Sequence, residues 1–229
     1  MRRPATFKQI SRLLMDSWIS SPAGLADPKG IYGPLHGMLR ANMVLLVVDT
    51  RSENPEEFHV DFVKDYTLPT GLTDMSLLQR SGLFTDFPDQ HYLQRIVVPA
   101  YADAVGRQRP VIGGIVTNIL DMHVAYDRII LPQKNSAGRS SWCIGLIDVR
   151  FLLPMGPRVD GLDDADLGII QMLVEGASTR EIADVMSLSA RTIEHRIERL
   201  KSSFGSRNIA HLVGLSISAG ISGIGKRGD

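Results

Sequence analysis

The sequence lacks several features that would point to a particular class of protein. It holds a single cysteine, Cys143, which excludes a disulfide framework and favours the cytoplasm. Basic and acidic residues number 25 each, so the net charge gives no indication of a nucleic-acid partner. No apolar run reaches the length of a membrane span, and the basic, amphipathic start lacks the apolar region of a secretion signal. We therefore expect a cytoplasmic protein that does not bind a membrane.

Patterns of catalysis and metal binding are also missing. No nucleophile motif such as Gly-x-Ser-x-Gly occurs, and no pair of nucleophile and base stands out, so we expect no enzyme activity. The histidines His36, His59, His91 and His123 show no ligand spacing with the cysteine or with carboxylates, so no metal site is expected. No motif requires a cofactor.

The most informative pattern is a pair of short helices joined by a tight turn, in the run STREIADVMSLSARTIEHRIERLKSSFG that begins at Ser178. Ser178 and Glu181 have the spacing of a capping box, which predicts that a helix starts here. Gly176 suits the left-handed end of a preceding helix. Leu188, in the turn, is expected to fill the core, and Ser189 to cap the next helix. That helix repeats apolar residues at helical spacing: Ile193, Ile197, Leu200 and Phe204.

A helix-turn-helix places its second helix in the major groove of DNA, where the N-terminal half meets the base edges. The face opposite the apolar repeat carries arginines that can bind guanine and glutamates that can accept from cytosine. Basic residues farther from this face suit phosphates. The predicted DNA-binding residues are Arg180, Ser189, Arg191, Thr192, Glu194, His195, Arg196, Glu198, Arg199, Lys201 and Arg207.

This segment resembles the LuxR-type (GerE-type) helix-turn-helix of bacterial transcription regulators, a domain of four helices. The resemblance covers the last quarter of the chain and rests on a set of matching positions: Leu162, Gly176, Ser178, Arg180, Glu181, Ile182, Ala183, Leu188, Ser189, Thr192, Ile193, Glu194, Leu200, Gly205 and Val213. Asp166, Arg196, Ser203 and Ile209 depart from the family pattern, and because Ser203 and Ile209 stand where a lysine and an arginine are common, the departures on balance remove positive charge. We therefore expect modest DNA affinity that depends on a homodimer. A fourth helix would pair the subunits through Leu212, Leu215 and Ile217.

The region before residue 154 alternates strand and helix patterns in an order that is not strictly βα. Two strands are predicted, at 43–48 and 58–63, then a helix from His91 to Val105, then three strands at 111–119, 122–131 and 142–151. A helix is also predicted at 7–19 and another at 31–40. This order suggests an antiparallel sheet with its helices on one side, and an α+β chain overall.

The order resembles the PAS fold, a sensory domain, over residues 32–153. The resemblance implies a pocket between the sheet and the helix from His91, for a small-molecule ligand or a protein partner. Three residues are candidates for binding a ligand: Tyr101, His123 and Tyr126. Proline and glycine cluster at 154–161, which predicts a linker between a sensory domain (1–153) and a DNA-binding domain (162–229).

The predicted function is a sequence-specific transcriptional regulator that binds double-stranded DNA and is controlled through its first domain. One alternative is a response regulator with a degenerate receiver, since MVLLVVDT could be a receiver's first strand, ending at Asp49. Asp49 has no acidic neighbour, and Arg150 and Phe151 stand where a receiver carries its lysine. Another alternative is an interaction protein whose helix-turn-helix contacts a second regulator and not DNA.

Overall fold

The computed structural model of the chain describes residues 5–69, 75–136, 138–157 and 159–224. The chain divides into two compact units. The first comprises Met1–Leu120 with Val124–Leu152, and the second comprises Asp121–His123 with Leu153–Asp229. Each unit has its own hydrophobic core, and we describe the two in turn.

The first unit is built on a six-stranded sheet with the strand order β3-β2-β1-β6-β5-β4. The sheet is antiparallel, and β1 lies between β2 and β6. Two strands, then helices, then three strands follow one another as the sequence predicted; the short β3 was missed. The strands are β1 (Met43–Asp49), β2 (His59–Lys64), β3 (Gly82–Leu83), β4 (Val111–Ile119), β5 (Met122–Pro132) and β6 (Trp142–Pro154).

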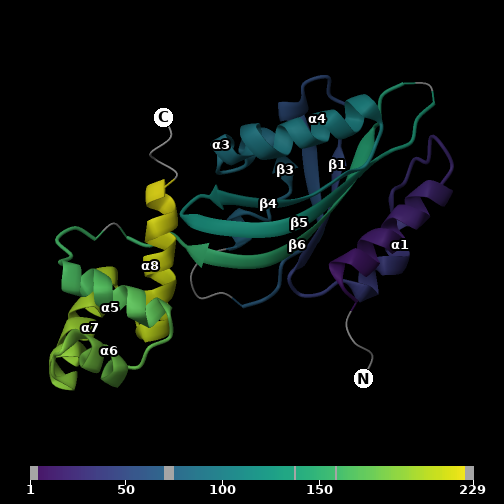
Figure 1. The fold of residues 1–229 in the computed structure, drawn as a ribbon. Coiled ribbons are helices and arrows are strands. Elements are labelled where there is room, and N and C mark those ends of the chain that lie inside the picture. The colour runs from purple at the N-terminus through teal and green to yellow at the C-terminus, as the bar shows by residue number, and fades with distance from the viewer. Residues whose placement is uncertain (1–4, 70–74, 137, 158, 225–229) are drawn as a thin grey trace. The chain divides into compact units, whose positions relative to one another are not determined.

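Helices cover both faces of this sheet, so the expectation that they lie on one side was wrong (Figure 1). Strand β1 shows why. Val44, Leu46 and Val48 pack on one face with α4, whereas Met43 and Leu45 pack on the other face with α1. Since neighbouring residues of a strand point to opposite faces, the unbroken apolar run of β1 is buried on both.

The first face is covered by one long helical segment that changes its winding. It begins as α3 (Gln90–Tyr92), continues as a π-helix (Leu93–Val97) and ends as α4 (Val98–Arg107). The sequence predicted one helix here, and the π-helix was missed. Pro99 stands at the start of α4, where it has no amide hydrogen for the helical ladder.

The second face is covered by α1 (Phe7–Ser20), α2 (Lys29–Tyr32) and a 3-10 helix (Gly33–Met38). Ile10 and Leu14 of α1 are fully buried against the sheet of the same chain. The helix predicted at 31–40 is instead two short turns with Pro34 inside the second. Three further 3-10 turns lie between strands, at Pro55–Glu57, Met75–Leu77 and Phe84–Asp86.

In the part of the second unit that the structure describes there are four helices, α5 (Asp164–Val174), α6 (Thr179–Met186), α7 (Ala190–Phe204) and α8 (Ile209–Ile224). Their core includes every residue of the predicted apolar repeat of α7. Gly176 and Gly205 have positive φ values, 89° and 62°, where they end α5 and α7 as expected. Leu188 is a correction, because it is 39% exposed and not part of the core.

Within the described part of the chain, every helix is too short or too polar to span a bilayer. The same residues contain no group of three histidine, cysteine, aspartate or glutamate side chains arranged to hold a metal ion.

Candidate nucleic-acid interface and ligand cavity

Local hydrogen bonds fix both helices of the helix-turn-helix, α6 and α7. The Ser178 amide donates to the Glu181 carboxylate over 2.7 Å, and the Glu181 amide donates back to the Ser178 hydroxyl, which completes the predicted capping box. Ser189 caps α7 by accepting from the Thr192 amide over 3.0 Å. Between them Ser187 takes a left-handed conformation with φ 54°. This turn places the N-terminal half of α7 at the surface.

A buried carboxylate holds two arginines of α7. Asp166 on α5 is only 2% exposed, and it accepts from Arg196 over 2.8 Å and from Arg199 over 2.5 Å. Arg196 also donates to Asp163, the residue that caps α5. Arg196 hydrogen bonds hold the pKa of the Asp163 carboxyl below its usual value. Arg196 and Arg199 therefore brace α7 against α5.

The remaining predicted DNA contacts divide by exposure and charge pairing. Lys201 is paired with Glu198 over 2.8 Å. Ser189 is occupied by its cap, whereas Arg191, Thr192, Glu194 and His195 are exposed along the first turns of α7. Arg180 and Arg207 are exposed outside that helix. Among the residues described, Arg180, Arg191 and Arg207 form no ion pair, so these three cations are the most available to phosphates or bases.

Helix α8 places its apolar residues in two different environments. Leu212 is fully buried and Leu215 is 6% exposed, and both pack in the core of the second unit. Ile217 is 42% exposed. Of the three residues predicted to pair subunits, Leu212 and Leu215 thus lie in the core of their own unit, and only Ile217 is at the surface.

The linker that precedes α5 is anchored on α8. Ser218 donates its hydroxyl to the Pro154 carbonyl over 2.6 Å and accepts from the Gly156 amide over 2.9 Å. A Cβ atom on Gly156 would lie 2.0 Å from the Leu215 carbonyl oxygen, so only glycine fits this contact. The first part of the predicted linker is therefore held against a helix of the second unit.

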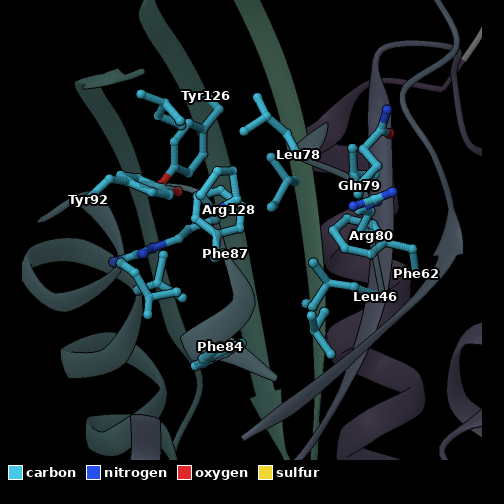
Figure 2. Close-up of a pocket in the computed structure, with 18 of the residues that line it drawn as sticks. Leu46, Phe62, Leu78, Gln79, Arg80, Phe84, Phe87, Tyr92, Tyr126 and Arg128 are labelled. Carbon is cyan, nitrogen blue, oxygen red and sulfur yellow. The ribbon is translucent and has the colours of Figure 1, made fainter. Parts of the chain in front are cut away.

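The first unit contains a cavity of about 550 Å³ between the sheet and the α3–α4 segment (Figure 2). This volume lies in the range of small-molecule sites. Most of the wall is apolar and comes from β1, β2, β5, β6, the β3 region and the helical segment. The lining includes Val44, Leu46, Phe62, Leu78, Phe84, Phe87, Leu93, Val124, Ile130 and Ile147.

Three tyrosines bring hydroxyl groups to this cavity. The hydroxyl oxygens of Tyr92 and Tyr126 lie 2.7 Å apart, so one phenol donates to the other (Figure 2). The Tyr101 ring lines the wall beside Gly145, where an added Cβ would lie 2.5 Å from the Tyr101 hydroxyl. Burial raises the pKa of all three phenols, which keeps them protonated.

Two of the three predicted ligand residues, Tyr101 and Tyr126, line the cavity, and His123 does not. The His123 ring is buried and lies 3.1 Å from the carbonyl oxygen of Ser218, both residues belonging to the second unit. Alternation along β5 explains the error, since residues 124, 126 and 128 share a face that residue 123 does not.

Sequence reasoning missed Tyr92 and Arg128 as lining residues. Arg128 donates to the Ile96 carbonyl over 3.0 Å, while its buried Nε–H has no acceptor among the described residues. The same alternation could have revealed Arg128, because it lies two residues after Tyr126 on a strand. No local pattern marked Tyr92 as a residue that faces the cavity.

Comparison with known proteins identifies the four-helix unit. Residues 164–216 match the model of bacterial regulatory proteins of the luxR family, so they form a LuxR-type helix-turn-helix domain. The transcriptional activator protein ExaE of Pseudomonas putida is 36% identical over 64 residues. That match covers 28% of this chain and 30% of the relative, so the chain spans under a third of the relative's length.

Solved structures give more distant matches. A VqmA dimer of Vibrio cholerae without target DNA, described as a LuxR-type receptor, is 22% identical with a TM-score of 0.26, over 48% of this chain and 55% of that one. A Vibrio cholerae VqmA–ligand–DNA complex is 16% identical with a TM-score of 0.32, over 82% and 86%. At these TM-scores the likeness establishes no detail of the first unit.

Proposed function

We propose that the chain is a DNA-binding transcriptional regulator, controlled by a small molecule in the cavity of its first unit. The observation that carries the DNA-binding part is the surface of α7 in a LuxR-type domain. Its N-terminal turns leave Arg191, Thr192 and His195 exposed, and Arg191 has no acidic partner among the described residues. These are the positions that reach base edges in a helix-turn-helix.

The ion pairs divide the basic residues into two roles. Arg196, Arg199 and Lys201 are neutralised within the domain, so they shape and support the reading helix. Arg191 reads bases, and Arg180 and Arg207 contact phosphates. Few free cations imply few released counterions, so the affinity of one domain is modest and falls only moderately with salt.

A dimer would raise this affinity by placing two reading helices on adjacent half-sites. We assign the pairing face to the exposed side of α8, where Ala210 and Ile217 lie two turns apart on the same face. Since the linker residues Pro154 and Gly156 bind the same helix, a change in the first unit has a route to the dimer contact.

The cavity supports the control part of the proposal. A regulator that acts only by constant DNA binding has no use for a cavity of about 550 Å³ lined by apolar side chains and a few polar ones. We therefore assign the first unit a sensory role, in which a ligand shifts the balance between two arrangements of the chain.

The decisive test selects a binding site from random double-stranded DNA with the full-length protein, followed by fluorescence anisotropy on the selected duplex. Arg191→Ala is expected to weaken specific binding about tenfold or more and to relax the sequence preference. Glu175→Ala, exposed at the end of α5, is the control and should change nothing. If wild type selects no sequence, or Arg191→Ala binds as well as wild type, the protein is instead an interaction module that contacts another regulator.

A further inference from the structure

The polar groups of the cavity are predominantly hydrogen-bond donors. One of the two phenols, Tyr92 or Tyr126, donates its hydrogen to the oxygen of the other. The hydrogen of the accepting phenol is therefore available to an acceptor on a ligand. The Nε–H of Arg128 is buried and unsatisfied among the described residues. A buried donor without a partner is costly, and a ligand acceptor would remove that cost.

The charged side chains around the cavity also favour an anionic ligand. Arg80, Asp86 and Arg128 are the lining residues that carry full charges, so the wall has one net positive charge. The Asp86 carboxylate is exposed and caps its own turn by accepting from the Leu83 amide over 3.0 Å. Arg128 is half-buried, and its charge opposes the rise in pKa that burial imposes on Tyr92, Tyr101 and Tyr126.

The rest of the wall is apolar and aromatic, with Leu46, Phe62, Leu78, Phe84 and Phe87 around the space (Figure 2). A fully polar ligand such as a sugar or nucleotide would leave most of its groups unpaired against this wall. A fully apolar ligand would leave the Arg128 Nε–H and one phenolic hydrogen of the tyrosine pair without an acceptor. A ligand with an apolar body and one anionic group satisfies both parts.

We propose that the cavity binds a compact, mostly apolar organic anion, whose charged group is held by Arg128 and the Tyr92–Tyr126 pair. This deepens the sensory role proposed above and rests on it for its biological meaning. The same arginine donates to the Ile96 carbonyl in the π-helix. An anion that binds Arg128 would therefore alter the hydrogen bond between this arginine and the helical segment that covers the sheet. Ligand binding could shift that segment in this way.

Two fluorescent probes test the anion preference. 1-Anilinonaphthalene-8-sulfonate carries the aromatic body and an anionic group, and N-phenyl-1-naphthylamine is the same body without the sulfonate. Each brightens on leaving water for an apolar site, and each should displace the other from the full-length protein. Arg128→Met is expected to raise the dissociation constant of the sulfonate probe about tenfold or more, and that of the neutral probe less than about twofold.

Arg150→Met is the matched control. Arg150 lies on the neighbouring strand and pairs with Asp127, the residue before Arg128 on β5 and therefore on the opposite face. It should leave both dissociation constants unchanged. Arg128→Lys, which keeps the charge but not the Nε–H, should weaken the sulfonate probe to an intermediate degree. Retained binding of the neutral probe shows that the Arg128 variants keep the cavity.

The proposal is wrong if wild type binds neither probe, if the two probes do not compete, or if Arg128→Met weakens both equally or neither. DNA binding separates this failure from that of the proposed function. A protein that prefers the sulfonate probe but selects no DNA keeps the anion site and loses the regulator role. A protein that selects DNA but shows no dependence on Arg128 keeps the regulator role and loses the anion site.

Discussion

The two units use their arginines in opposite ways. In the second unit Arg196 and Arg199 are satisfied by carboxylates of the same domain, and the free cations are at the surface. In the first unit Arg128 lines the cavity, donates to the Ile96 carbonyl of the covering helical segment, and keeps a buried Nε–H without an acceptor among the described residues. An exposed cation can contact a large hydrated polyanion such as DNA. A buried donor can be satisfied only by a partner small enough to enter the cavity. Under the proposed function, this difference corresponds to DNA binding by the second unit and ligand binding by the first.

The hydrophobic cores of the two units also differ, because a cavity lies within the core of the first unit. The helical unit packs one continuous core with every α7 apolar residue in it. The first unit has a sheet with a core on each face, and one of them is interrupted by the cavity. A substitution that creates or fills space should therefore affect stability most in the helical unit and ligand binding most in the first unit. Four predictions test this contrast, in order of decreasing effect.

The largest effect is expected from Leu212→Ala in the helical core. Leu212 is fully buried, so its truncation should lower the free energy of unfolding by about 2–5 kcal/mol. Ile217→Ala, on the exposed side of the same helix, should lower it by about 0.5 kcal/mol and weaken self-association instead. Both tryptophans, Trp18 and Trp142, lie in the first unit. Far-ultraviolet circular dichroism should therefore detect the Leu212 change before tryptophan fluorescence does.

Equal stability of the two variants would contradict this division of α8. A loss of dimer from Leu212→Ala without a loss of stability would restore the pairing role that the sequence suggested for this residue. Sedimentation velocity at several protein concentrations measures the dimer directly.

The next effect is expected from Gly145→Ala beside the cavity. The added methyl group would lie 2.5 Å from the Tyr101 hydroxyl and 2.7 Å from Leu46 Cδ1, so it forces both side chains to move. Overpacking of this kind costs about 1–3 kcal/mol, and here it should also reduce binding of the neutral probe. Gly113→Ala on β4 meets no atom within 4 Å and is the control. Unchanged unfolding and probe binding in Gly145→Ala would show that the wall yields to the methyl group.

How far the sequence predicted these features depends on how local their causes are. Ser178, Glu181 and Gly176 act on residues within five positions, so the caps and ends of the second unit were predicted from the pattern. Strand β1 pairs with β6, with Val44 opposite Ile147, and nothing local to either segment states that partner. The coverage of both faces depends on such pairings, whereas a pocket between the sheet and the helix from His91 was expected from the resemblance to the PAS fold and is present. Leu188 was misplaced because an apolar residue in the turn was expected to be buried, and nothing local to it marks it as exposed.

A smaller effect is expected from Asp166→Asn in the brace between α5 and α7. Asparagine keeps the volume but loses the negative charge and one acceptor oxygen, and the arginines that contact it are partly exposed and can be hydrated. We expect the free energy of unfolding of the helical unit to fall by about 1–2 kcal/mol, as measured by circular dichroism during unfolding in urea. Arg196 keeps its pair with Asp163, so Arg199 is the cation that is freed, and it should raise non-specific DNA affinity and steepen its salt dependence. If the variant bound non-specific DNA more weakly and unfolded with the same free energy as wild type, the ion pairs with Asp166 would not limit the contact of these arginines with DNA.

The smallest effect is the pH dependence of the same brace. Arg196 holds the pKa of the Asp163 carboxyl below its usual value, so this carboxyl binds its proton at higher pH in the unfolded chain than in the folded one. Its contribution is therefore complete above an unfolded pKa of about 3.9 and is lost as the pH falls through the lower, folded value. Hydrogen exchange of α5 and α7 amides at pH 6 and pH 3 measures it, with Arg196→Met as the variant that lacks the pair. The difference in protection between wild type and Arg196→Met should shrink at pH 3. Because Asp163 is exposed, water screens the pair, and a difference that stays constant with pH would assign the bracing to the Asp166 contacts alone.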